Sequence, residues 1–69
     1  MKGYEFRTVD GDRWRIIGSE RDKSDAIVER DHLKRLYRED YPHSIFKIEP
    51  AVDGNGYKYW DVLMRTTNR

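Results

Sequence analysis

The chain contains no cysteine, and this absence limits both its chemistry and its cellular setting. Without cysteine there are no disulfide bonds and no metal sites built on thiolates. Small secreted domains usually depend on such cross-links to compensate for a small core. The sequence also lacks a hydrophobic run near the roughly 20 residues that a membrane-spanning helix needs, and residues 1–10 lack the apolar centre of a signal peptide. We therefore expect a cytoplasmic protein with no membrane partner.

A surplus of charge of one sign is also missing. The chain has 14 lysines and arginines against 13 acidic residues, which leaves a formal net charge of +1. The two signs are interspersed along the whole chain, so no segment is a basic arm or an acidic tail. The electrostatic field that draws proteins non-specifically to nucleic acid is therefore weak.

Motifs of catalysis and metal binding are a third absence. The chain has two histidines, His32 and His43, and no HxxxH or HExxH spacing, whereas a zinc site needs three or four converging ligands. The glycines form no phosphate-binding GxGxxG or GxxxxGK motif, and no GxSxG sequence presents a serine nucleophile. We predict that the protein is not an enzyme and that it carries neither a cofactor nor a metal ion.

The residues that are present favour one small folded domain spanning residues 1–69. A chain of 69 residues is close to the lower size limit for folding around a single apolar core. Charged residues make up 39% of it, but 13% are aromatic, and each aromatic side chain buries a large area. Because disordered chains are usually poor in aromatics and carry a large net charge, we expect this chain to fold.

The spacing of apolar residues predicts two hairpins with a helix between them. Alternation in "YEFRTV" (4–9) and "RWRII" (13–17) indicates two strands, and the Asp-Gly pair between them favours a tight turn. From residue 25 to about residue 40 the spacing becomes helical, with Ser24 as the expected N-cap and Pro42 as the stop. "SIFKIE" (44–49) and residues 57–66 read as two further strands, joined by the turn "DGNG".

The resulting order is β-β-α-β-β, which we interpret as an α+β fold. Its economical form has two layers: one antiparallel four-stranded sheet with one helix packed on one face. Neighbours along a strand point to opposite faces, so alternation assigns each strand residue to a side. We expect the helix-covered face to carry Tyr4, Phe6, Trp14, Ile16, Phe46, Ile48, Trp60, Val62 and Met64, packed against Ala26, Ile27, Leu33, Leu36 and Tyr37.

The opposite face has no second helix to cover it, and we predict that it is the binding surface. The candidate binding residues are Arg7, Arg13, Arg15, Lys47, Tyr57, Tyr59, Leu63 and Arg65. Aromatic, aliphatic and arginine side chains that are exposed together often mark a contact surface. Cross-strand pairs of the same residue types also stabilise a sheet that has no partner, so a purely structural role for this face stays open.

Two functions fit such a face. The first is a small non-catalytic protein-binding module, such as an inhibitor, an adaptor or a regulatory subunit, whose partner is another protein or a second copy in a homodimer. The alternative is a nucleic-acid-binding domain that uses the same face, with tyrosines stacked on bases and cations on phosphates. Acidic residues interleaved on this face favour the protein partner.

Overall fold

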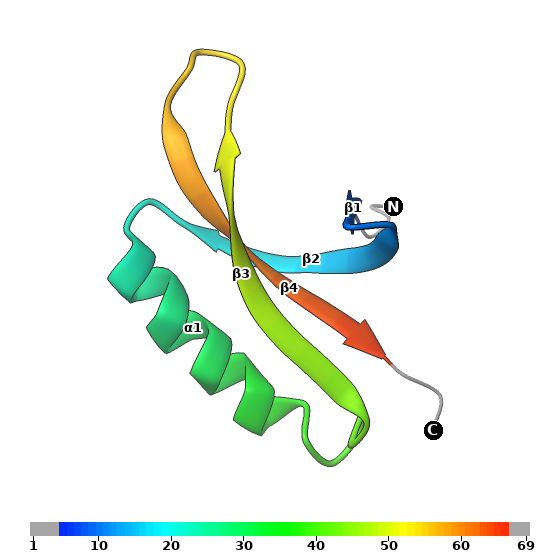
Figure 1. Cartoon of the computed structure of the whole chain (residues 1–69). Coiled ribbons are helices and arrows are strands. Elements are labelled where there is room, and N and C mark those ends of the chain that lie inside the picture. The colour runs from blue at the N-terminus through cyan, green and yellow to red at the C-terminus, as the bar shows by residue number, and fades with distance from the viewer. Residues whose placement is uncertain (1–4, 67–69) are drawn as a thin grey trace, which may run out of the picture.

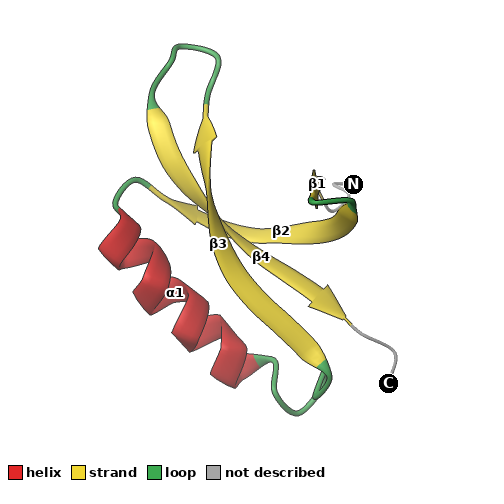
Figure 2. Cartoon of the chain, in the orientation of Figure 1, coloured by secondary structure: helices red, strands yellow, loops and turns green. Residues whose placement is uncertain are grey.

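Two hairpins and one helix make up the part of the chain that the computed structural model describes, residues 5–66 (Figure 1). The elements are β1 (Glu5–Val9), β2 (Asp12–Glu20), α1 (Lys23–Leu36), β3 (Ser44–Val52) and β4 (Lys58–Thr66). The strands form one antiparallel sheet in the order β1-β2-β4-β3. This confirms the predicted α+β fold, with its β-β-α-β-β order and one helix on one face of the sheet (Figure 2). Tyr4, which we expected in the core, lies outside the described residues.

Both turn signals in the sequence form hairpins. Asp10 and Gly11 connect β1 to β2 with φ values of 53° and 87°. Two consecutive positive φ values define the type I′ turn, whose twist matches that of the flanking strands. In the connection from β3 to β4, Asp53 Oδ1 accepts hydrogen bonds from the amides of Asn55 and Tyr57 at 2.8 and 3.0 Å. The aspartate side chain therefore holds this longer turn together.

Helix α1 begins and ends earlier than the sequence predicted. Its N-cap is Asp22 instead of Ser24, and the residues after Leu36 continue as turns. The amides of Tyr37 and Tyr41 donate to the carbonyls four residues before them, at 2.9 and 2.8 Å, so the chain stays coiled close to Pro42. The apolar spacing of residues 37–41, which predicted a longer helix, thus belongs to turns that follow the regular helix.

The main core lies between α1 and the sheet. Ala26 and Leu33 of the helix pack against Val62 of β4, and all three are buried. Four partly buried side chains surround them: Ile17, Tyr37, Ile48 and Trp60. At the end of the helix the Tyr37 ring stacks on Phe46 with 6.4 Å between ring centroids. These contacts confirm the predicted facing of β3 and β4, whereas Leu36, which we expected in the core, is exposed.

One extra residue in β2 inverts the predicted facing of that strand. Ile16 pairs with Leu63 but Gly18 pairs with Val62, so Ile17 is an extra residue, a β-bulge. Directly opposite residues share a face, which places Ile16 with Leu63, away from the helix. Trp14, two residues earlier, lies on that same face. The prediction that Trp14 and Ile16 point toward the helix is therefore wrong, and Ile17 packs against the helix core instead.

Strand β4 is buried on both faces. Four consecutive residues, Asp61, Val62, Leu63 and Met64, are buried, although neighbours in a strand point to opposite sides. Helix α1 explains the burial of only one side. The burial of Asp61 and Leu63 means that the face opposite the helix is covered as well.

Candidate functional site

A second apolar layer lies on the face opposite α1. Trp14 is 6% exposed and Leu63 is 0% exposed, and Ile16 lies directly across from Leu63. Leu63 was predicted as a binding residue on this face. It is on the expected face, but its burial removes it from the molecular surface, and it serves as a core residue.

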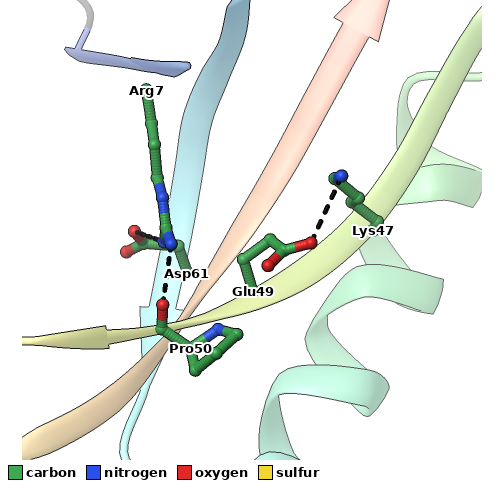
Figure 3. A network of polar contacts seen from close by, with 5 residues as sticks. All are labelled: Arg7, Lys47, Glu49, Pro50 and Asp61. Carbon is green, nitrogen blue, oxygen red and sulfur yellow. Dashed lines mark hydrogen bonds and ion pairs between the residues drawn. The ribbon is translucent and has the colours of Figure 1, made fainter. Parts of the chain in front are cut away.

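Arg7 reaches across this face from one edge of the sheet toward the other (Figure 3). Its Nη1 donates to Asp61 Oδ2 at 2.9 Å, and its Nη2 donates to the carbonyl oxygen of Pro50 at 2.8 Å. The Asp61 side chain is almost fully buried, so its charge is stabilised only if a partner cation accompanies it. Arg7 therefore links β1 to β4 and β3, and its side chain covers the Asp61 carboxylate on this face.

Lys47 and Arg65 cover the ring of Trp14. Lys47 Nζ lies 4.5 Å from the ring centroid and Arg65 Cζ lies 5.8 Å from it. Lys47 also pairs with Glu49 at 3.2 Å (Figure 3), and Arg65 pairs with Asp12 at 3.5 Å. Cation–π contacts of this kind contribute about 0.5–2 kcal/mol each. These two cations, like Arg7, are already engaged by acids or rings of the same chain.

Arg13 and Arg15 lie on the other face of the sheet, contrary to the prediction. Arg15 pairs with Met64, which shares the helix-bearing face with Val62. Arg13 is two residues away on the same side, and its guanidinium carbon lies 4.0 Å from the centroid of the Phe6 ring. The inversion follows from the bulge at Ile17. The single surface of tyrosines and cations expected from the sequence is therefore not assembled.

Three of the predicted cations do meet at the end of the sheet where β1, β2 and β4 lie together. They line a hollow of about 400 Å³ whose walls are Phe6, Arg13, Arg15, Met64, Arg65 and Thr66. No acidic residue is among these lining residues. This cationic hollow is suited to an anionic group.

Tyr57 and Tyr59 lie at the opposite end of the sheet, in the part of the β3–β4 hairpin that is close to its turn. This hairpin projects beyond β2, because Trp60 is the last residue of β4 to pair with it (Figure 1). Tyr57 precedes the strand and is 59% exposed, with the Arg21 guanidinium carbon 5.7 Å from its ring centroid. A hollow of about 400 Å³ is lined here by Ser19, Glu20, Arg21, Asp53, Tyr57, Lys58 and Tyr59.

A second hollow shares Lys58 and Tyr59 with the first. Its volume is about 420 Å³, and its remaining lining residues are Pro50, Ala51, Val52 and Trp60. We call the two hollows together the hairpin-root surface, because the first of them adjoins the end of β2 beyond which the hairpin projects. It holds two of the predicted binding residues, Tyr57 and Tyr59. Sequence reasoning gave no role to Arg21, because only the pairing of Glu20 with Trp60 brings it beside the hairpin.

The described residues, 5–66, contain neither a metal-ligand cluster nor a membrane-spanning helix. Within residues 5–66, no three histidine or carboxylate side chains come together as metal ligands. No helix in that range has the length and apolar character needed to cross a membrane. No protein-family model, curated protein or solved structure matches the chain.

Proposed function

We propose that the chain is a small, non-catalytic protein-binding module of the cytoplasm, an inhibitor, adaptor or regulatory subunit, and that the hairpin-root surface contacts its partner. The observation that carries this proposal is the composition of that surface. Tyr57, Tyr59 and Trp60 lie around the two adjoining hollows, with Arg21 beside them. Tyrosine, tryptophan and arginine are the residue types that most often dominate the binding energy of protein interfaces.

The charges of this surface are balanced. Arg21 and Lys58 lie in the same hollow as Glu20 and Asp53. A polyanion would meet repulsion from the two acids, whereas a protein surface of mixed charge finds complementary groups. On the face opposite α1, Arg7, Lys47 and Arg65 are satisfied by acids of this chain, which leaves the hairpin root as the better surface for a partner.

A comparative capture experiment tests this proposal. The wild-type chain and a Tyr57→Ala/Tyr59→Ala variant are immobilised and exposed to nuclease-treated cytoplasmic extract of the source cell. We expect a protein that the wild type retains, that the double variant loses, and that forms a stoichiometric complex when purified. Tyr41→Ala is the matched control, because Tyr41 is exposed but lies beside Tyr37 at the far end of the helix. Equal retention by all three chains would refute the role of the hairpin root.

Nucleic-acid binding is a second candidate, favoured by the cationic hollow alone. Arg13, Arg15 and Arg65 line it, although Arg65 also pairs with Asp12 at 3.5 Å. Phe6, which is 45% exposed and has the Arg13 guanidinium over its ring, is the aromatic side chain on which a base would stack. The test is a fluorescence titration with single-stranded DNA and RNA at about 50 mM salt, repeated at rising salt, because phosphate contacts weaken steeply with ionic strength. Salt-sensitive binding that Arg13→Glu abolishes would favour this candidate, and absence of binding at low salt would remove it.

A further inference from the structure

Strand β3 is an edge of the sheet. It pairs with β4 on one side over all nine of its residues, Ser44–Val52, and no strand within residues 5–66 pairs with its other side (Figure 2). An edge strand presents backbone N–H and C=O groups that can pair with another strand. The length of this edge is sufficient for a complete ladder.

Symmetry restricts how a second copy can pair with this edge. In an antiparallel pair of identical strands, the two-fold axis stands perpendicular to the sheet, so paired side chains must lie on the same face. The register that pairs the whole strand end to end places Ile48 on the axis, opposite Ile48 of the second copy. It also sets Ser44 opposite the second copy's Val52.

The charges of β3 select this same register. With Ile48 on the axis, Lys47 faces Glu49 of the second copy, and Glu49 faces its Lys47. Lys47 and Glu49 already pair within one chain at 3.2 Å and project from the same face (Figure 3). The dimer therefore joins four charges of alternating sign. The adjacent registers that keep faces matched are centred on Lys47 or Glu49, and they set like charges opposite each other.

The apolar residues of the strand are also complementary. Ile45, which is 44% exposed, meets Ala51 of the second copy on the face opposite the helix. On the helix-bearing face, Phe46 meets the second copy's Pro50, and Val52, which is 61% exposed, meets Ser44. Pro50 has no N–H, and its carbonyl oxygen already accepts a hydrogen bond from Arg7 Nη2 at 2.8 Å, so we expect the ladder to be weakest at this residue.

We propose that two copies of this chain join through their β3 edges, in the register centred on Ile48, to form one continuous eight-stranded sheet. Pro50, Ala51 and Val52, which line the second hollow, belong to the paired edge, whereas the first hollow contains no residue of β3. The dimer is a proposal separate from partner binding at the first hollow and goes beyond the proposed function. Lysine and proline are also residues that keep edge strands from pairing. If Lys47 and Pro50 prevented edge pairing, the protein would be a monomer at every concentration. The Lys47–Glu49 spacing instead predicts that the edge pairs with a second copy of itself.

The experiment measures the mass of the full chain in solution across a wide concentration range, by sedimentation equilibrium. We expect a monomer–dimer equilibrium for the wild type. Lys47→Glu and Glu49→Lys should each weaken the dimer by about tenfold or more, because each places like charges opposite each other. An equimolar mixture of the two variants should form a heterodimer, since every pair is then one lysine against one glutamate. Glu5→Lys is the control, because Glu5 is exposed and the variant makes the same charge change as Glu49→Lys on β1, at the opposite edge.

A second measurement does not depend on any variant. Lys47 covers Trp14, so Lys47→Glu also carries a risk to folding, which circular dichroism will reveal. In the wild type, hydrogen exchange of β3 amides that do not bond to β4 should slow as the protein concentration rises. A wild type that stays monomeric, an exchange rate independent of concentration, or folded single variants that fail to form the heterodimer would each overturn the proposal.

Discussion

Arg7 and Asp61 are 54 positions apart in the chain, yet Arg7 Nη1 lies 2.9 Å from Asp61 Oδ2. The two residues belong to β1 and β4, which are not neighbours, because β2 lies between them. A cation must therefore extend over the face of β2 to reach the carboxylate. The pair fixes β1 relative to the centre of the sheet, and it lies beside the buried layer of Trp14 and Leu63 on the same face.

We expect Arg7→Met to destabilise the protein by about 1–3 kcal/mol, because it leaves the buried Asp61 carboxylate without its cation. Urea denaturation followed by circular dichroism measures the loss. Arg30→Met is the matched control: Arg30 is about as exposed as Arg7 and pairs with its neighbour Asp31 at 3.1 Å, but the Asp31 side chain is 47% exposed, whereas that of Asp61 is 7% exposed. Its cost should stay below about 1 kcal/mol. Equal losses for the two variants would show that the Arg7 pair has no special structural role.

The two tryptophans should differ in their contribution to stability. Trp14 is buried, whereas Trp60 is only half-buried and borders a surface hollow. Trp14→Ala should cost about 3–5 kcal/mol, a large part of the stability of a small domain. Trp60→Ala should cost less, although alternation alone assigns both residues to the same core.

Trp14→Phe is the informative partner variant. Among the described residues, no acceptor lies within hydrogen-bond reach of the buried Trp14 Nε1. Phenylalanine keeps most of the apolar contact and removes this unsatisfied donor, so its loss of stability should be well below that of Trp14→Ala. Thermal unfolding of the three variants ranks them, and a larger loss for Trp60→Ala than for Trp14→Ala would contradict the burial.

The elements of this fold are readable from the sequence because their signals are local. The Asp10-Gly11 pair specifies a turn through its backbone preferences, and alternation in the flanking residues specifies strands. The order of strands and helix then leaves few ways to cover an antiparallel sheet. No long-range information is needed for any of these steps.

The faces of β2 are not readable in the same way. Alternation gives Trp14 and Ile16 a common side, which is correct, but it does not say which side faces the helix. One extra residue, Ile17, decides that question, and a shift of one residue exchanges the two faces of a strand. The predicted binding site is wrong for the same reason: the bulge places Arg13 and Arg15 on the helix-bearing face. The cover formed by Arg7 over Asp61 depends on tertiary contacts that no local pattern reports.

The two hairpins make a matched test of backbone conformation. Gly11 has a φ of 87°, a region that costs other residues about 1–2 kcal/mol, whereas Gly54 does not adopt a positive φ. Neither glycine has a neighbouring atom that an added methyl group would meet, so sterics with the rest of the protein do not differ. Gly11→Ala should therefore lower the free energy of unfolding by about 1–2 kcal/mol, and Gly54→Ala should change it by less than about 1 kcal/mol. Chemical denaturation of both variants decides this, and equal effects would contradict the type I′ turn.

Asp53 both stabilises the β3–β4 turn and lies in the hairpin-root surface beside Tyr57. Its Oδ1 accepts hydrogen bonds from the amides of Asn55 and Tyr57, so Asp53→Ala removes two bonds of about 0.5–1.5 kcal/mol each. We expect faster hydrogen exchange at both amides and weaker partner capture, because Tyr57 loses the contact that positions it. Asp53→Asn is the control, since it keeps an oxygen acceptor at the same place and removes only the charge. If Asp53→Asn matched Asp53→Ala in exchange and capture, the negative charge would be the important property, and the positioning of Tyr57 by these hydrogen bonds would be refuted.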